Sequence, residues 1–281
     1  SAVVALRPST GEILAAANGT GSDGYNTATF GQYAPGSTFK IVTALALMRA
    51  GVGPDDPLPC TRSIVVDGKT FTNYDDYPAE RLGDIPLRSA VANSCNTALI
   101  SRHEELTGAD LTGAAASLGV GVDHDLGFPA YFGQVPDPAS ETEKAASLIG
   151  QGTVLASPMA MAAVAASVAE GRTVVPSLLP DQPAPEAGPA EPLTSQEADA
   201  LRDMMRAAVT EGTATFLADV PGAPVGAKTG TAEFGTDNPP DTHAWMIATQ
   251  GDLAVAVFVE EGQSGSRTAG PILEQVLRAA R

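Results

Sequence analysis

The sequence predicts a mixed α/β domain of the α+β type, in which helices flank one antiparallel five-stranded sheet and an all-helical lobe lies beside it. The order of the patterns along the 281 residues is the first reason, because strand-like runs are followed by helical patterns, more strands and a last helix. Composition is the second reason, since abundant Ala and Gly with only 5% aromatic residues favour closely packed helices over a β-sandwich. With 43% hydrophobic residues, the chain can bury a substantial core.

The N-terminal part predicts a hairpin and then a long helix. Apolar runs at 2–6 and 13–17 flank a turn-rich stretch, which is typical of two paired strands. Residues 18–36 predict a loop, and Pro35-Gly36-Ser37 opens a helix that closes at Gly51.

The middle of the chain is mostly helical in pattern. Residues 52–80 are rich in Pro and Asp and are expected to be mostly irregular, and the Pro-rich stretch 176–192 predicts a loop. Between them, helical patterns cover 86–107, 110–119, 140–149 and 158–170.

The C-terminal part begins with a helix at 194–211, after which the spacing of the apolar residues changes from a helical to a strand pattern. Three strands are predicted at 223–232, 243–250 and 253–260, followed by a closing helix at 269–281. The simplest packing places the first hairpin beside these strands in one sheet. We therefore expect a single domain over 1–281, with a sheet-containing lobe from about 1–55 and 190–281 and a helical lobe from about 56–189.

Charge and cysteine content narrow the function. A net charge of −17 would repel a phosphate backbone, so we expect no nucleic-acid partner. Cys60 and Cys95 are the two cysteines, and they permit one disulfide. Two small buried thiols are the alternative reading, which the sequence leaves open.

Three short patterns carry the chemistry. They occur once each and in this order: Ser37-Thr38-Phe39-Lys40 (S-x-x-K), Ser94-Cys95-Asn96 (S-x-N) and Lys228-Thr229-Gly230 (K-T-G). A single S-x-x-K is expected by chance in a chain of this length. The chain holds only four lysines, however, and two of them fall in these patterns. Coincidence therefore explains the set poorly.

A serine hydroxyl is a poor nucleophile until a base removes its proton. Residues three apart on a helix share a face, so Lys40 can sit over Ser37. Burial and a second positive charge, such as that of Lys228, would lower the pKa of Lys40 and allow it to act as the base. The helix N-terminus would favour negative charge near Ser37. The alternative without catalysis is that Ser37 only caps the helix and that the Lys40 side chain is exposed to solvent.

The other two patterns add polar groups. Ser94 and Asn96 begin an apolar helical pattern, where they are either a cap or a proton-passing hydroxyl and an orienting amide. Strand alternation places Lys228 and Gly230 on one face, where Gly230 leaves room for a substrate backbone and Lys228 can bind a carboxylate. The hydroxyls of Thr229 and Thr231 supply hydrogen-bond donors.

Competing chemistries fail specific tests. Gly68-Lys69-Thr70 resembles the end of a P-loop, but Ser63 holds the position of the required glycine. The sequence has no G-x-S-x-G elbow, and Thr107 stands where a zinc protease would have its second histidine after His103. The three histidines are scattered, so we expect no metal and no cofactor.

The three patterns together resemble the signature of penicillin-recognising serine enzymes. The likeness to class B penicillin-binding proteins extends over the whole chain. It includes the segments 33–40, Ile149-Gly150-Gln151-Gly152 with 157–162, Glu211-Gly212-Thr213-Ala214 with 228–233, and His243-Ala244-Trp245. Ser-Cys-Asn as the second pattern is similar to that of the actinobacterial members of the class.

The resemblance implies a penicillin-binding-protein/β-lactamase-like transpeptidase fold and a D,D-transpeptidase. Ser37 would attack peptidoglycan stem peptides ending in D-Ala-D-Ala, with Lys40 as base, Ser94 passing the proton to the leaving amine and Asn96 holding the donor peptide. Lys228, Thr229 and Thr231 would bind the terminal carboxylate. Backbone N–H groups of Ser37 and Thr231 would stabilise the oxyanion, and β-lactam antibiotics would trap Ser37 covalently.

The resemblance also implies a cellular setting. Class B proteins normally carry an N-terminal membrane anchor and a non-catalytic domain, so we expect an extracytoplasmic catalytic domain held at the outer face of the plasma membrane by an anchor that this chain lacks. A glycosyltransferase of the cell-division or cell-elongation machinery is the implied partner protein. A β-lactamase and a β-lactam sensor domain are the alternatives. A class A β-lactamase would have Asp where Cys95 stands and would contain an E-x-x-L-N motif, which is absent. The G-Q-G segment argues against a sensor domain.

Overall fold

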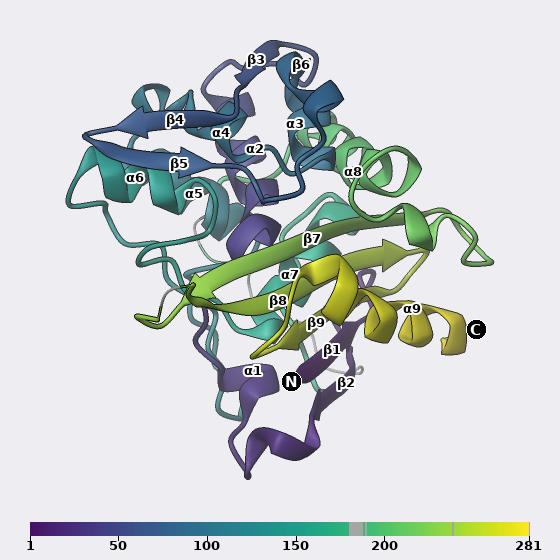
Figure 1. Ribbon diagram of the computed structural model, residues 1–281. Helices are drawn as coiled ribbons and strands as arrows, with labels where there is room; N and C mark the ends of the chain where they lie inside the picture. The colour runs from purple at the N-terminus through teal and green to yellow at the C-terminus, as the bar shows by residue number, and fades with distance from the viewer. Residues whose placement is uncertain (180–187, 189, 238, 281) are drawn as a thin grey trace.

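One antiparallel sheet of five strands organises the molecule. The computed structural model describes residues 1–179, 188, 190–237 and 239–280, so part of the loop predicted at 176–192 lies outside the described residues. The sheet has the order β2-β1-β9-β8-β7 (Figure 1). Its strands are β1 (Ala2–Leu6), β2 (Ile13–Asn18), β7 (Val225–Phe234), β8 (Asp241–Gln250) and β9 (Ala254–Val259). The N-terminal hairpin therefore pairs with the C-terminal strands, which confirms the predicted sheet.

Alternation along the strands separates two apolar faces. Trp245 and Ile247 of β8 pack into the larger core, together with residues of α2 (Lys40–Arg49), α5 (Gly108–Ser117) and α7 (Pro158–Glu170). Met246, between them, points to the opposite face and packs with residues of the C-terminal helix α9 (Gly270–Ala279). Figure 1 shows α9 in front of the sheet and α7 behind it. Both faces of the sheet are thus covered by helices.

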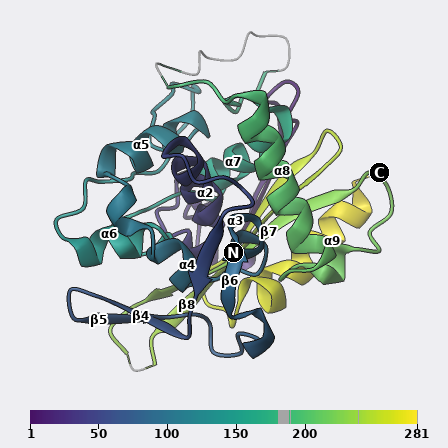
Figure 2. The same cartoon turned by 90° about the horizontal axis from the view of Figure 1, so that it is seen from above.

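The helical part lies beyond the free edge of β7. It holds α3 (Leu87–Ala92), α4 (Asn96–Ile100), α5 and α6 (Glu141–Ser147), and Figure 2 shows α4, α5 and α6 on one side of the molecule with α3 near its middle. Helix α8 (Ser195–Thr210) packs against both α3 and β7 and joins this part to the sheet. Helix α7 falls in the range expected for the helical lobe, yet it packs against β1, β8 and β9.

Residues 52–80 are more regular than the sequence predicts. Strands β4 (Ser63–Val66) and β5 (Lys69–Thr72) form a hairpin, and β3 (Pro57–Cys60) pairs with β6 (Gly83–Pro86). Four-residue strands give too few alternations for a period to be read. The prediction of a mostly irregular segment therefore missed three short strands, although turns and irregular stretches separate them.

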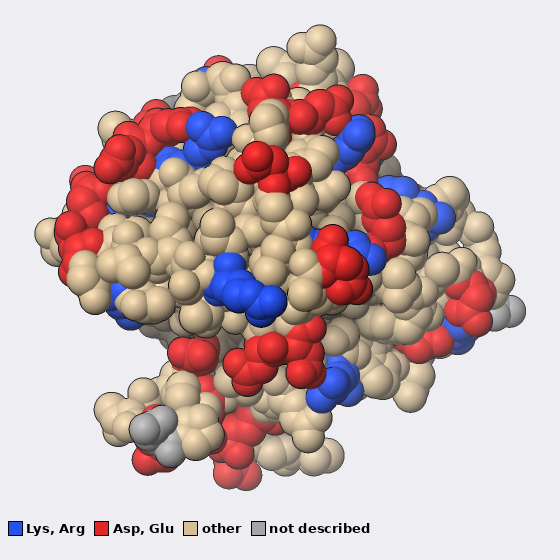
Figure 3. Space-filling view, turned by 45° about the horizontal axis from the view of Figure 1, so that its top comes forward, with Lys and Arg blue, Asp and Glu red and all other residues tan. Residues whose placement is uncertain are grey.

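Short helical segments complete the described chain. They are η1 (Thr20–Ser22), α1 (Thr27–Phe30), η2 (Gly36–Phe39), η3 (Ala79–Arg81), η4 (His103–Glu105), η5 (Thr215–Leu217) and the π-helical turn η6 (Gly265–Ala269). In the described ranges, no helix combines the length and the apolar character that crossing a bilayer requires. Figure 3 shows Asp and Glu side chains spread over one face of the molecule, in keeping with the net charge of −17.

Candidate active site

Ser37 and Lys40 lie on the first turn of the buried helix behind β7. The predicted helix starts as the 3₁₀ turn η2, and the backbone N–H of Lys40 donates to the carbonyl groups of Ser37 and Thr38. Side chains three residues apart eclipse each other on a 3₁₀ turn, so Lys40 stands directly over Ser37. Ser37 is partly exposed, whereas Lys40 is buried.

Glycines allow this turn to approach its neighbours. Gly36 has a φ of 53° and lies against the carbonyl group of Thr231, and its N–H donates to the carbonyl oxygen of Gly150 over 2.9 Å. A Cβ at Gly230 would lie 2.8 Å from the methyl group of Thr38 and 2.9 Å from its nitrogen. The turn η2, which carries Ser37, is thus packed between β7 and the G-Q-G segment. Gly150 explains why that segment needs glycine, since its φ is 69°.

Ser94 stands at a sharp break between α3 and α4. The N–H of Ser94 donates to Val91 O over 3.1 Å, and the N–H of Cys95 donates to Ala90 O over 2.8 Å. These two bonds form a Schellman motif, in which the left-handed position is usually occupied by glycine. Ser94 occupies it with a φ of 60°. The single helix predicted over 86–107 is therefore wrong, because the chain turns at this serine.

The break turns Ser94 and Asn96 toward Lys40. Lys40 Nζ donates to Asn96 Oδ1 over 2.6 Å and to the carbonyl oxygen of Ser94 over 2.8 Å, and it lies 3.2 Å from Ser94 Oγ. Lys228 Nζ lies 3.0 Å from the same Ser94 Oγ and donates to the carbonyl oxygen of Thr229 over 2.8 Å. One hydroxyl thus bridges two buried amines from different parts of the chain.

The environment of the two amines disfavours their charged forms. Burial, and then the charge of Lys228, hold the pKa of Lys40 well below its usual value. Burial lowers the pKa of Lys228 to about 7. In its neutral form, Lys40 has two N–H bonds for the carbonyl oxygens of Ser94 and Asn96. Its lone pair can then accept the proton of a hydroxyl.

The remaining residues of the third motif have separate partners. Thr229 Oγ1 lies 2.7 Å from Thr213 Oγ1, and Thr231 Oγ1 accepts from the N–H of Gly265 over 3.3 Å. The N–H of Thr213 donates to Ala92 O over 3.2 Å, so the segment Glu211-Gly212-Thr213 links the end of α3 to β7. Sequence reasoning gave Thr213 no role, and its only signal was its membership of that segment.

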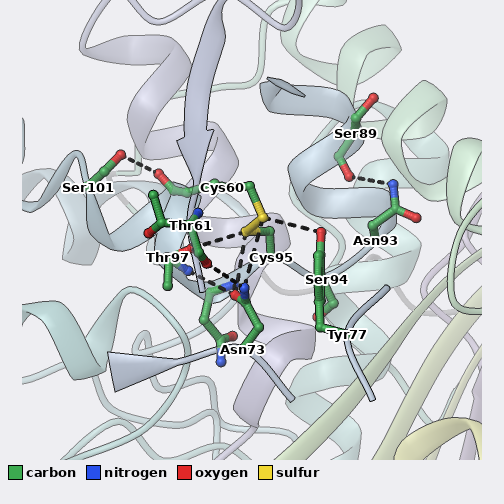
Figure 4. The surroundings of a disulfide bond; sticks show 12 residues. Cys60, Thr61, Asn73, Tyr77, Ser89, Asn93, Ser94, Cys95, Thr97 and Ser101 are labelled. Carbon is green, nitrogen blue, oxygen red and sulfur yellow. Dashed lines mark hydrogen bonds between the residues drawn. A yellow bond between two sulfur atoms is a disulfide. The ribbon is translucent and has the colours of Figure 1, made fainter. Parts of the chain in front are cut away.

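The structure joins Cys60 and Cys95, the pairing that the sequence left open. The S–S distance is 2.07 Å, and Figure 4 shows the bond directly beside the second motif. Asn73 lies next to it and contacts the start of α4. Asn73 carries no signal in the sequence, because a single Asn after the mixed stretch Lys69-Thr70-Phe71-Thr72 is an ordinary loop residue.

Some groups are not brought together. In the part of the chain that the structure describes, no hydrogen bond joins the Ser37 side chain to Lys40, whose nitrogen is engaged by Ser94 and Asn96. The histidines lie apart: His243 stacks on Phe234 with ring centroids 4.0 Å apart, and His103 Nδ1 lies 3.0 Å from Ile100 O. Over residues 1–179, 188, 190–237 and 239–280, no group of three His, Cys, Asp or Glu side chains is arranged to hold a metal.

Comparison with known proteins accounts for this arrangement. The family model of the penicillin binding protein transpeptidase domain matches residues 1–278. This chain belongs to that family. It is 32% identical to peptidoglycan D,D-transpeptidase PbpA of Mycobacterium tuberculosis over 99% of its own length, and it spans 66% of the length of that relative. The predicted likeness to the actinobacterial members of class B is confirmed.

Solved structures agree with this family assignment. The ceftriaxone acyl-enzyme complex of penicillin-binding protein A from M. tuberculosis aligns with a TM-score of 0.84 at 30% identity, over 100% of this chain and 74% of that one. Penicillin-binding protein 2 of Pseudomonas aeruginosa, in complex with WCK 5153, aligns with a TM-score of 0.85 at 26% identity, over 99% and 73% of the two chains. The predicted fold class is therefore confirmed.

Proposed function

We propose that this chain is the catalytic domain of a peptidoglycan D,D-transpeptidase, which forms an acyl-enzyme on Ser37 and is inhibited covalently by β-lactams. The observation that supports this most is the hydroxyl of Ser94 held between the buried amines Lys40 and Lys228. That arrangement provides a base, a proton carrier and a positive charge beside one serine on a helix start.

Acylation begins with attack of Ser37 Oγ on the carbonyl carbon between the two D-alanines, while neutral Lys40 takes the serine proton. The N–H groups of Ser37 and Thr231 stabilise the negative charge on the tetrahedral oxygen. The proton passes from Lys40 through the Ser94 hydroxyl to the leaving amine, the C–N bond breaks, and the terminal D-alanine departs. Asn96 keeps Lys40 aligned through its 2.6 Å contact.

Transfer completes the cycle. The amine of a neighbouring stem peptide attacks the ester carbon, its proton returns through the same groups, and Ser37 leaves as an alcohol. Lys228, Thr229 and Thr231 bind the terminal carboxylate of the donor, because a positive charge and two hydroxyls lie along the free edge of β7. The expectation that Gly230 leaves room for a substrate backbone is not met, because the space over Gly230 is taken by Thr38, whose methyl group would lie 2.8 Å from a Cβ there.

The cellular setting follows the same proposal. The domain acts on peptidoglycan stem peptides at the outer face of the plasma membrane and serves cell division or cell shape. A glycosyltransferase is the proposed partner. A chain of a peptidoglycan synthase complex that coordinates polymerization and crosslinking supports it, with a TM-score of 0.86 at 30% identity over 99% of this chain and 55% of that one.

The test is a benzylpenicillin adduct mapped by peptide mass spectrometry. We expect one adduct on Ser37, none in Ser37→Ala, and loss of about 10²–10⁴-fold in acylation rate or more in Lys40→Ala, because the base is gone. The adduct should persist for minutes to hours after a chase. Rapid loss with multiple turnovers would instead identify a β-lactamase, and an adduct on Ser94 would refute the assigned nucleophile.

A further inference from the structure

Helix α4, which carries Asn96, cannot cap its own start. It has five residues, and Cys95, the residue before it, makes no side-chain hydrogen bond to its first turn. The first N–H groups of a helix need acceptors from elsewhere. Here Asn73, from the segment just after β5, provides one: its Oδ1 accepts from the N–H of Asn96 over 2.8 Å and from the N–H of Thr97 over 3.2 Å.

The rest of the Asn73 amide is also fixed. Its Nδ2 donates to the carbonyl oxygen of Thr61 over 2.9 Å, and the side chain is only 8% exposed. Thr61 is itself held by Thr97, whose Oγ1 donates to Thr61 O over 2.8 Å and accepts from its N–H over 2.9 Å. Figure 4 shows Asn73 beside the disulfide and this threonine pair. Asn73 is thus locked at both ends of its amide.

The residue next to Asn73 orients the side chain of Asn96. Asn96 Nδ2 donates to the carbonyl oxygen of Thr72 over 2.7 Å. A carbonyl oxygen can only accept, so this bond fixes which end of the Asn96 amide faces away from the base. The Asn96 oxygen is left facing Lys40 Nζ at 2.6 Å. The end of β5 therefore controls both the backbone and the amide orientation of Asn96.

We propose that Asn73 is a positioning residue for acyl transfer, which acts by holding Asn96 Oδ1 against the amine of Lys40. The inference rests on the acyl-transfer function proposed above. Loss of Asn73 would free the start of α4 and let Asn96 shift relative to Lys40. A misplacement of about 1 Å in a catalytic group costs roughly 10²-fold in rate.

The experiment compares Asn73→Ala, Asn73→Asp and a matched capping control, Thr107→Ala. Thr107 caps α5 through Asp110 on the exposed side of the helical part and touches none of the site residues. For each folded, disulfide-bonded protein, stopped-flow mixing with a fluorescent penicillin gives the acylation rate constant and the dissociation constant of the complex formed before acylation. Thermal unfolding gives Tm.

We expect Asn73→Ala to lower the acylation rate constant about 10²-fold with an unchanged dissociation constant. Asn73→Asp should lose less, roughly tenfold, because a carboxylate oxygen still accepts from both N–H groups but cannot donate to the carbonyl oxygen of Thr61 as the Asn73 amide does. Thr107→Ala should lower Tm by a few degrees at the parental rate.

Three outcomes would overturn the proposal: a parental rate in Asn73→Ala, a change confined to the dissociation constant, or an equal loss in the capping control. If Asn73→Ala does not fold, Asn73→Asp takes its place, and a parental rate or a change confined to the dissociation constant in that variant contradicts the proposal equally. Failure of the parent protein to acylate at Ser37 would refute the proposed function instead, so the two failures are distinguishable.

Discussion

At the scale of single residues, the protonation of two buried lysines controls the chemistry. Acylation needs Lys40 neutral, so the rate should rise with pH as Lys40 loses its proton. Carboxylate binding needs Lys228 charged, so the rate should fall as pH rises past the pKa of Lys228, which is about 7. The expected profile of acylation rate against pH is therefore bell-shaped. The two limbs of this profile report apparent pKa values that belong to Lys40 and Lys228 as a coupled pair.

Lys228→Arg tests the assignment of the high-pH limb. A guanidinium stays charged at every accessible pH, so this limb should disappear, and the loss of rate should be smaller than in Lys228→Ala. The exposed Lys69→Arg is the matched control and should keep the parental profile. Two results would show that Lys228 fixes geometry rather than providing charge. One is a high-pH limb that persists in Lys228→Arg, and the other is an equal loss of acylation rate in Lys228→Arg and Lys228→Ala.

At the scale of elements, the turn between α3 and α4 has a strained backbone at Ser94, the residue whose hydroxyl contacts both lysines. Ser94 holds a left-handed conformation that usually belongs to glycine. Ser94→Gly and Ser94→Ala both remove the hydroxyl, and both should abolish efficient acylation. They differ only in the backbone, because a left-handed position disfavours a Cβ by roughly 1 kcal/mol.

Urea unfolding of the two variants isolates that strain. The glycine variant should have a free energy of unfolding about 1 kcal/mol above that of the alanine variant. Because both lack the same contacts to Lys40 and Lys228, those losses cancel in the comparison. Equal stability, or a more stable alanine variant, would show that the turn is unstrained.

Long, strongly patterned elements were predictable from the sequence. The hairpin and the three C-terminal strands are found within two residues of the expected bounds, because short apolar runs bounded by turn residues are typical of strands buried in a sheet. The segment before Ser94 misled the prediction, since the apolar period continues through the break. Its conformation is fixed by tertiary contacts with Lys40 and Lys228, which no local pattern reveals.

At the scale of the whole molecule, the site lies where the sheet and the helical part meet. The segment with Ser37 and Lys40 packs against β7, while Ser94 and Asn96 come from the helical part, 54 and 56 residues after Lys40. The motif residues themselves could be predicted, because their order and residue types carry the chemistry. Asn73 and Thr213 could not, since their roles arise only from tertiary contacts: Asn73 caps α4, and Thr213 contacts both Ala92 at the end of α3 and Thr229 of β7.

The central claim is that Ser37 transfers an acyl group from a D-Ala-D-Ala peptide to an amine. The most direct measurement incubates the protein with a pentapeptide donor ending in D-Ala-D-Ala and an amine acceptor, and follows the products by mass spectrometry. We predict release of D-alanine together with an amide-linked donor–acceptor product, and neither in Ser37→Ala. Penicillin acylation of Ser37 without any peptide turnover, or a linked product that survives in Ser37→Ala, would contradict the account.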